Sequence, residues 1–358
     1  MKIGIGVYNS VWLPDLEKVD HPQVFRNDLE QARIAEAAGL DSIWCTEHHF
    51  LSTGNNPSPL TLCAAMAAVT TRIELGPAVM LGPLYHPIRV AEECAIVDLI
   101  SGGRLRVGIG LGYRDEEYRG IGVDRKRRGV MTDELIQVMK QAWADGPVEF
   151  HGRYHDFSGV DVQPKPHQRG GPPIWTGGNG DPALRRAARF ADGFIMDGGT
   201  DSKSFSGTGY NRAIFGRIEE MVSRYRLALE SEGRRYDDMT FALTIGGFLS
   251  DRSADDAWAT VQDAYMSTRR VYADWYGLKP DEYKRWYPSL MTEEEHEARR
   301  AELWLGTPDE LLPLFRQLAT LCGDRLHVMF RTKYPGVPHE QTKRSIELLG
   351  ELRKTVAG

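Results

Sequence analysis

Two histidines and a glutamate follow a short apolar segment near the start of the chain. Residues 42–46 have the composition of a buried strand, and Glu47, His48 and His49 come directly after them. Ligands bind at the carboxyl ends of the strands in parallel α/β proteins. Imidazole titrates near neutral pH, so it can accept or donate a proton during a reaction. The pattern favours an acid–base site, and the simpler alternative is a carboxylate that orients one structural histidine.

A metal site is a second interpretation of these residues, with His86 as a further ligand from another strand end. Adjacent residues of a strand point to opposite faces, so His48 and His49 would not both face one ion. We therefore predict no metal site. The sequence also has no GxxxxGK[ST], GxSxG or HExxH motif, which leaves the usual NTPase, hydrolase and zinc-protease interpretations without support.

The segment 108–113 alternates glycine with other residues directly after a predicted strand. It is not a dinucleotide-binding fingerprint, because the third glycine of GxGxxG would fall at Tyr113 and the motif follows the fourth strand. Glycine allows a flat ligand to approach the backbone, and it equally allows a tight loop. Gly110 and Tyr113 are therefore candidates for ligand contacts or for a plain turn.

A second glycine-rich loop, residues 175–182, connects a predicted strand to a helix that begins at Asp181 and Pro182. Such a junction directs backbone N–H groups and the positive end of the helix dipole at an anion. The alternative is an ordinary capped helix start, and the charge of Asp181 counts against a phosphate. The candidate ligand-binding residues here are Gly177, Gly178, Asn179, Gly180 and Asp181.

The candidate site residues are far apart in the sequence, and a parallel sheet would bring them together. The chain alternates short apolar runs with helical patterns, as such a sheet requires. The predicted strands cover residues 3–8, 42–46, 73–81, 104–109, 174–177, 193–197, 240–249 and 325–330. The predicted helices cover residues 25–38, 59–70, 88–100, 128–144, 182–190, 217–232, 254–270, 308–321 and 341–354. Thr307 is the expected cap of the helix 308–321. Strands alternating with helices predict a parallel sheet, and a count of eight fits a closed (β/α)8 TIM barrel.

We expect one domain over residues 1–358, with two insertions. Residues 146–172 are rich in Gly, Pro and His, and residues 271–300 contain six large aromatic side chains among charges. Long insertions in a compact domain are usually functional or disordered, and the aromatic content argues against disorder in the second.

Composition excludes several classes of partner. The net charge of −6 and the pI of about 6.0 disfavour a nucleic-acid partner. No apolar stretch approaches the roughly 18 residues that span a membrane. The chain starts directly in a strand pattern without the features of a signal peptide. Its four cysteines are isolated from one another, so we expect neither a zinc site nor a redox dithiol, and we expect a reducing cytoplasm.

Taken together, the motifs resemble the bacterial luciferase-like family of flavin-dependent monooxygenases. The matching segments are residues 44–50, 75–81, 86–89, 101–110, 177–182, 187–193 and 305–310. They occur in the family's order along nearly the whole chain. The resemblance implies a barrel that holds reduced flavin mononucleotide (FMN) over the carboxyl ends of its strands. In such enzymes the reduced flavin reacts with O2 to form a peroxide, which oxygenates a small organic substrate.

The resemblance also assigns residues. Ala78 and Val79 match the place where members often have a non-proline cis peptide beneath the flavin ring, and the turn 177–181 matches the flavin phosphate region. His48 matches the active-site histidine, and the segment 271–300 falls where luciferases carry a mobile loop. We therefore expect His48 to be the acid–base residue, with Glu47 and His49 as its neighbours, and 271–300 to be an aromatic lid.

This chain departs from the luciferases at two positions. Leu111 stands where they have a phosphate-contacting arginine, and Gly110 stands where they have a reactive cysteine. Light emission is therefore not implied. The family also suggests a separate flavin reductase as the source of reduced FMN, and a homodimer formed through the second and third helices. A deazaflavin-dependent hydride transferase and a non-catalytic flavin-binding protein remain as alternatives. The sequence does not identify the substrate.

Overall fold

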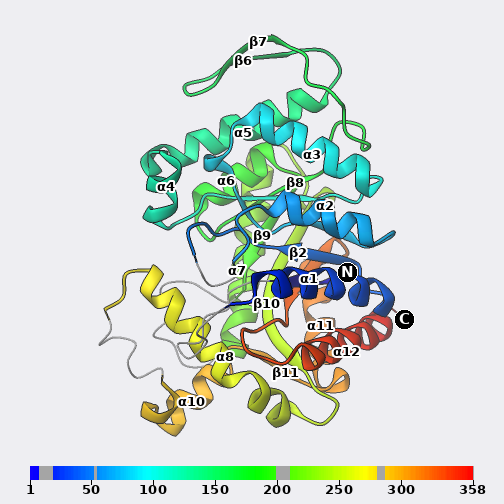
Figure 1. Ribbon diagram of the computed structural model, residues 1–358, viewed down its shortest axis with the longest axis vertical. Helices are drawn as coiled ribbons and strands as arrows, with labels where there is room; N and C mark the ends of the chain where they lie inside the picture. The colour runs from blue at the N-terminus through cyan, green and yellow to red at the C-terminus, as the bar shows by residue number, and fades with distance from the viewer. Residues whose placement is uncertain (8–18, 52–54, 199–209, 280–286, 358) are drawn as a thin grey trace.

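A computed structural model describes residues 1–7, 19–51, 55–198, 210–279 and 287–357 of the chain. Within these residues, eight parallel strand positions alternate with helices around a barrel, which confirms the predicted fold (Figure 1). The strands are β1 (Lys2–Val7), β2 (Ser42–Cys45), β3 (Glu74–Pro77) with β4 (Met80–Leu81), β5 (Val107–Gly110), β8 (Ile174–Gly177), β9 (Gly193–Asp197), β10 (Thr240–Leu249) and β12 (Leu326–Arg331).

Hydrogen bonds around the sheet close it into a barrel. The strand order is β3-β2-β1-β12-β10-β9-β8-β5-β4, so the two ends of the series are β3 and β4. These two are halves of the single strand predicted over residues 73–81, interrupted at the cis peptide bond between Ala78 and Val79. The gap is bridged because Leu75 N donates to Arg104 O at 3.2 Å, and β4 pairs with β5.

The helices pack around the outside of the barrel, and their apolar faces form the main core with the outer faces of the strands. They are α1 (His21–Ala38), α2 (Pro59–Val69), α3 (Pro87–Ser101), α5 (Arg128–Trp143), α6 (Asp181–Phe190), α7 (Tyr210–Ser231), α8 (Ala254–Trp275), α11 (Pro308–Cys322) and α12 (His339–Ala357). The predicted cap of α11 is confirmed, since Thr307 Oγ1 accepts a hydrogen bond from Glu310 N.

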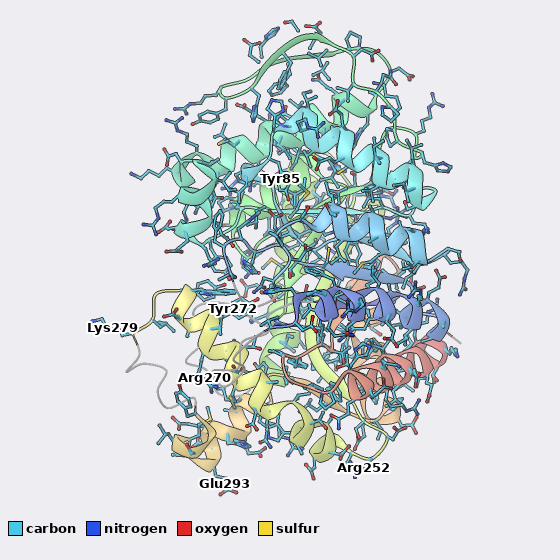
Figure 2. All side chains as sticks on the ribbon, viewed as in Figure 1. Tyr85, Arg252, Arg270, Tyr272, Lys279 and Glu293 are labelled. Atoms are coloured by element: carbon cyan, nitrogen blue, oxygen red, sulfur yellow. The ribbon has the colours of Figure 1, made fainter. Side chains whose placement is uncertain are left out.

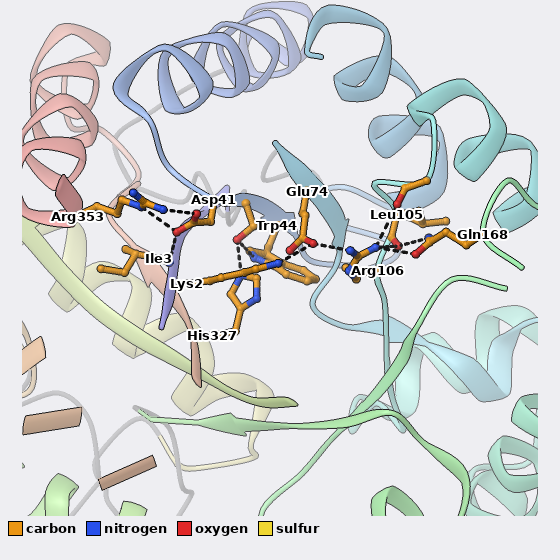
Figure 3. Close-up of polar contacts among 12 residues, drawn as sticks. Lys2, Ile3, Asp41, Trp44, Glu74, Leu105, Arg106, Gln168, His327 and Arg353 are labelled. Carbon is orange, nitrogen blue, oxygen red and sulfur yellow. Dashed lines mark hydrogen bonds and ion pairs between the residues drawn. The ribbon is translucent and has the colours of Figure 1, made fainter. Parts of the chain in front are cut away.

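The inside of the barrel is filled by side chains at its amino-terminal end. The Trp44 and Trp175 rings lie 5.0 Å apart, and the His327 ring contacts both. Burial holds the pKa of His327 well below its usual range, so its ring is neutral. Ser42 Oγ accepts a hydrogen bond from Trp44 Nε1 at 2.7 Å and lies 2.6 Å from His327 Nε2 (Figure 3).

A ring of charges surrounds this filled end. Glu74 meets both Lys2 and Arg106, and Arg106 also donates to Gln168 (Figure 3). With the amino-terminal end filled and rimmed in this way, the carboxyl ends of the strands are where a ligand can enter. No helix among the described residues is long and apolar enough to cross a membrane.

The two predicted insertions have structure of their own. Residues 146–172 contain an antiparallel hairpin, β6 (Val148–His151) and β7 (Asp156–Val160), which extends beyond α3 and α5 in Figure 1. The start of the segment 271–300 differs from the prediction. Helix α8 continues to Trp275, so residues 271–275 are the end of this helix. The 310 turn η6 (Pro288–Leu290) and α10 (Glu293–Arg300) follow, while residues 280–286 lie outside the described part of the chain.

Other short elements among the described residues were also not predicted. They include α4 (Asp115–Ile121), α10 and β11 (Trp304–Gly306), and β11 pairs with the end of β10. Each is too short for a periodic pattern to stand out. Helix α4 contributes to the site described next, and so do residues 302–303, which come directly before β11.

Candidate active site

A cavity of about 320 Å³ lies at the carboxyl end of the barrel. Ligand pockets in proteins typically begin at about this size. Its wall is formed by residues that follow β2, β5 and β8, by Ala78 and Val79 between β3 and β4, by residues of β9, β10 and β12, and by the last turns of α8. Figure 2 shows Tyr272 of α8 pointing toward the middle of the molecule, whereas Lys279 points outward.

Most of the predicted site residues line this cavity. They are Glu47, His48, Ala78, Val79, Gly110, Tyr113, Gly177, Gly178 and Asn179. His49, Gly180 and Asp181 do not line it. Asp181 instead forms an ion pair with Arg224 at 2.6 Å, and this contact holds the pKa of the exposed carboxyl below its usual range. The cavity side of the glycine loop is therefore its first half, residues 177–179.

One face of the cavity has little side-chain bulk. Gly110, Gly177 and Gly178 lie there beside Ala78 and Val79. A Cβ atom on Gly110 would come within 2.4 Å of Val79 Cγ2, and one on Gly177 within 3.2 Å of Val79 Cγ1. The valine side chain therefore packs against the bare backbone of two neighbouring strands, and glycine is required at Gly110. We call these five residues the floor.

His48 is held by a carboxylate that the sequence analysis did not identify. His48 Nδ1 lies 3.0 Å from Glu117 Oε1, and the Glu117 side chain, on α4, is only 1% exposed. The same oxygen accepts hydrogen bonds from His49 N at 3.1 Å and from Arg114 Nη1 at 3.2 Å. Burial alone would raise the pKa of Glu117, but the hydrogen bond to His48, the charges and the backbone N–H together lower it.

His49 points away from the cavity and pairs with Glu47. Its Nε2 lies 2.6 Å from Glu47 Oε1, and the other carboxylate oxygen accepts a hydrogen bond from Leu81 N at 2.8 Å. This hydrogen bond to Glu47 raises the pKa of His49, although burial acts in the opposite direction. Glu47 thus links the end of β2 to β4, next to the floor.

Aromatic side chains from the end of α8 cover His48 and its neighbours. The Trp275 ring lies 4.9 Å from the His48 ring and 4.8 Å from the guanidinium carbon of Arg114. Tyr276 stacks on Tyr113 at 4.8 Å, with the ring planes 19° apart. The aromatic segment that was predicted to be a lid therefore contacts the site with its first residues.

A buried charge cluster forms another part of the wall. Glu302 accepts hydrogen bonds from the Tyr265 hydroxyl and from Arg299 Nη1, the latter at 2.5 Å, and it also pairs with Arg269 at 3.3 Å. Glu302 and Arg269 line the cavity, and so does Arg331 at the end of β12. Sequence reasoning did not identify this cluster, because Tyr265 and Arg269 lie 37 and 33 residues before Glu302.

The site can be compared with known proteins. A model of the luciferase-like monooxygenase family matches residues 1–331. The chain belongs to this family. Among its luciferase-like relatives, the oxygenase component of the flavin-dependent trigonelline monooxygenase of Acinetobacter baylyi is 34% identical over 155 residues, 43% of each chain. The matched region spans about half the length of the curated relatives.

Solved structures of other proteins show the same fold over nearly their full length. The monooxygenase RslO1 of Streptomyces bottropensis has a TM-score of 0.78 at 23% identity and covers 100% of both chains. The FMN-bound oxygenating constituent of 3,6-diketocamphane monooxygenase of Pseudomonas putida has a TM-score of 0.74 at 20% identity, covering 98% and 97%. A coenzyme F420-dependent tetrahydromethanopterin reductase of Methanopyrus kandleri scores 0.71 at 20% identity, covering 98% of each chain.

Proposed function

We propose that this protein is the oxygenase of a two-component flavin-dependent monooxygenase. It would bind reduced FMN supplied by a separate flavin reductase, and it would use O2 to oxygenate a small organic substrate. The observation that carries the proposal is the floor of Ala78, Val79 and three glycines beside His48. Family membership and the FMN in the diketocamphane enzyme support the same cofactor.

The residues present fit a flavin. The floor presents backbone and small side chains, which a planar ring system can approach closely. Tyr113 lines the cavity, and its buried hydroxyl has no hydrogen-bond partner among the described residues. Burial raises the pKa of Tyr113 well above its usual range, so the hydroxyl remains a donor for a ligand oxygen. Residues 177–179, ahead of α6, would receive the phosphate.

The chemistry of the bound cofactor would be the transfer of two electrons to O2, with one oxygen atom going to the substrate and the other to water. The chain's own residues would position the ring on the floor and move protons through His48. The aromatic side chains of α8 would exclude water from the cavity. Glu47 and His49 would hold the end of β2 against β4, beneath the site.

Binding and oxygen uptake test the proposal together. The protein would be titrated under anaerobic conditions with reduced FMN, reduced riboflavin and reduced F420, and bound cofactor would then be exposed to O2. We expect FMN to bind more tightly than riboflavin, because only FMN carries the phosphate. NADH alone should not reduce the bound FMN, whereas addition of a flavin reductase should start oxygen uptake. If none of the three cofactors binds, the proposal is contradicted.

Hydride transfer with a deazaflavin is the second candidate. It is favoured by Leu111, which lines the cavity where luciferases have an arginine, and by the F420-dependent structural neighbours. The same titration separates the two candidates, since deazaflavin reacts as a hydride carrier without O2. Tight binding of F420 without measurable binding of reduced FMN would establish the second candidate. Binding of FMN without oxygen consumption, with or without substrates, would indicate a flavin-binding protein.

A homodimer is part of the proposal. The outer surface of α3 carries exposed Ile96, Leu99 and Ile100, with exposed fractions of 45%, 43% and 50%. Adjacent exposed apolar side chains often mark protein contacts. This helix is one of the two through which we expect the subunits to pair.

A further inference from the structure

The contact between His48 and Glu117 determines where the ring of His48 carries its proton. A carboxylate that is ionised accepts hydrogen bonds and has none to donate. Glu117 is fully buried, yet its pKa is lowered, so the group is ionised near neutral pH. The 3.0 Å contact between His48 Nδ1 and Glu117 Oε1 therefore requires the hydrogen on Nδ1.

The other nitrogen of the ring is then the reactive one. In a neutral imidazole with Nδ1–H, Nε2 carries the lone pair. No described residue forms a hydrogen bond with His48 Nε2, and the His48 side chain lines the cavity. Nε2 is thus the atom through which His48 can take a proton from a ligand in the cavity.

We propose that Glu117 is a positioning residue, which fixes His48 in the Nδ1–H form, directs Nε2 to the cavity and stabilises the ring when Nε2 has accepted a proton. The proton-transfer part of this inference rests on the proposed function, whereas the fixed tautomer does not. Neither the family match nor the relatives assign a role to Glu117.

The surroundings of Glu117 hold the pair in place. Arg114 Nη1 donates to both Glu117 Oε1 and His49 O, at 3.2 and 3.0 Å. Trp275, the last residue of α8, packs against both His48 and Arg114. Glu117 Oε1 thus lies within hydrogen-bond distance of His48, His49 N and Arg114 at once, and the Tyr113 ring lies 6.1 Å from the His48 ring.

Two substitutions separate the two parts of the role. Glu117→Gln keeps an acceptor oxygen and removes the charge, so the tautomer should be retained while the protonated ring loses its counter-charge. Glu117→Met removes both the acceptor and the charge, so the tautomer should become mixed. Glu116→Gln is the matched control, because Glu116 is the preceding residue of α4 and its side chain is 56% exposed.

The tautomer is read by nitrogen NMR of protein labelled with 15N-histidine, with His48→Gln identifying the His48 signals. Protonated and bare ring nitrogens have widely separated chemical shifts, so this measurement needs no substrate or cofactor. In the native protein and in Glu117→Gln, Nδ1 should carry the hydrogen. A native His48 with the hydrogen on Nε2, or an unchanged tautomer in well-folded Glu117→Met, overturns the proposal.

The kinetic part uses reoxidation of pre-bound reduced FMN by O2, followed by stopped-flow absorbance. Loss of the charge that stabilises the protonated ring should slow this reaction in Glu117→Gln by about 10- to 100-fold. Glu117→Asp should recover part of the rate, and Glu116→Gln should equal the native protein. If the tautomer is fixed but Glu117→Gln reacts at the native rate, Glu117 does not stabilise the protonated His48 ring. Failure of FMN to bind refutes the proposed function and leaves the tautomer result standing.

Discussion

Replacing His48 and His49 one at a time makes a matched experiment, because each side chain has one hydrogen bond to a buried carboxylate. His48 Nδ1 lies 3.0 Å from Glu117 and His49 Nε2 lies 2.6 Å from Glu47. The two carboxylate side chains are 1% and 0% exposed. Loss of a hydrogen bond to a charged group costs about 1.5–3 kcal/mol. His48→Ala and His49→Ala should therefore lower the free energy of unfolding by similar amounts.

The rates should separate them. Only His48 lines the cavity, and a general acid or base typically contributes about 100- to 10,000-fold to a rate. Single-turnover oxidation of pre-bound reduced FMN should therefore slow by about that factor in His48→Ala, with FMN affinity changed little. In His49→Ala, substrate oxygenation should proceed at close to the native rate. If oxygenation survives in His48→Ala but collapses in a well-folded His49→Ala, the assignment is reversed.

The pH dependence of stability gives a second check on the same pair. Glu47 raises the pKa of His49 above the usual value of 6.5. A raised pKa means that folding is favoured by protonation, so this contribution is fully present below pH 6.5 and is lost as the pH rises through the folded-state value. The stability difference between native protein and His49→Gln should therefore shrink in urea titrations as the pH rises from below 6.5 through the folded-state pKa of His49.

Four further outcomes are expected. Hydrogen bonds lower the pKa of Glu36 to about 2 despite partial burial, so its contribution is fully present above pH 4.5 and is lost as the pH falls through 2. Glu36→Gln should therefore cost about 1 kcal/mol at pH 7 in urea titrations and much less at pH 2. Gly110→Ala should weaken FMN binding in anaerobic titrations, and Val79→Ala in the same chain should restore it, because the clash is with Val79 Cγ2. Hydrogen exchange in the segment 271–300 should slow when FMN and substrate bind, and unchanged protection would contradict a lid. Ile96→Glu should convert a dimer to a monomer by light scattering at micromolar concentration, whereas a native monomer would contradict the pairing.

The floor of the site could be predicted from sequence because it depends on local backbone features. Gly177 ends a predicted strand, Gly110 directly follows another, and Val79 lies between the two halves of a third. Strand alternation also separated His48 from His49, and the structure places only His48 on the cavity. Gly180 and Asp181 do not line the cavity, because helix α6 begins there and Asp181 pairs with Arg224.

The walls could not be predicted in the same way. Glu117 lies 69 residues after His48, and its short helix has no periodic pattern. A clue was present in the three consecutive acids, Asp115 to Glu117, which open a helix directly after the glycine-rich loop. Arg269 and Glu302 meet across 33 residues, part of which lies outside the described chain. Such contacts depend on tertiary packing, which composition and spacing do not encode.

The division between floor and walls has a mechanistic consequence. Residues of the floor come from strand ends whose positions the barrel fixes, whereas the wall over His48 comes from the end of α8. Trp275 touches both His48 and Arg114, and Arg114 is hydrogen-bonded to the carboxylate that holds His48. A change of substrate that moved the end of α8 would therefore also move the partners of His48. If His48 transfers protons as proposed, substrate fit and proton transfer would be linked at this point, and substitutions at Trp275 should alter rate and substrate preference together.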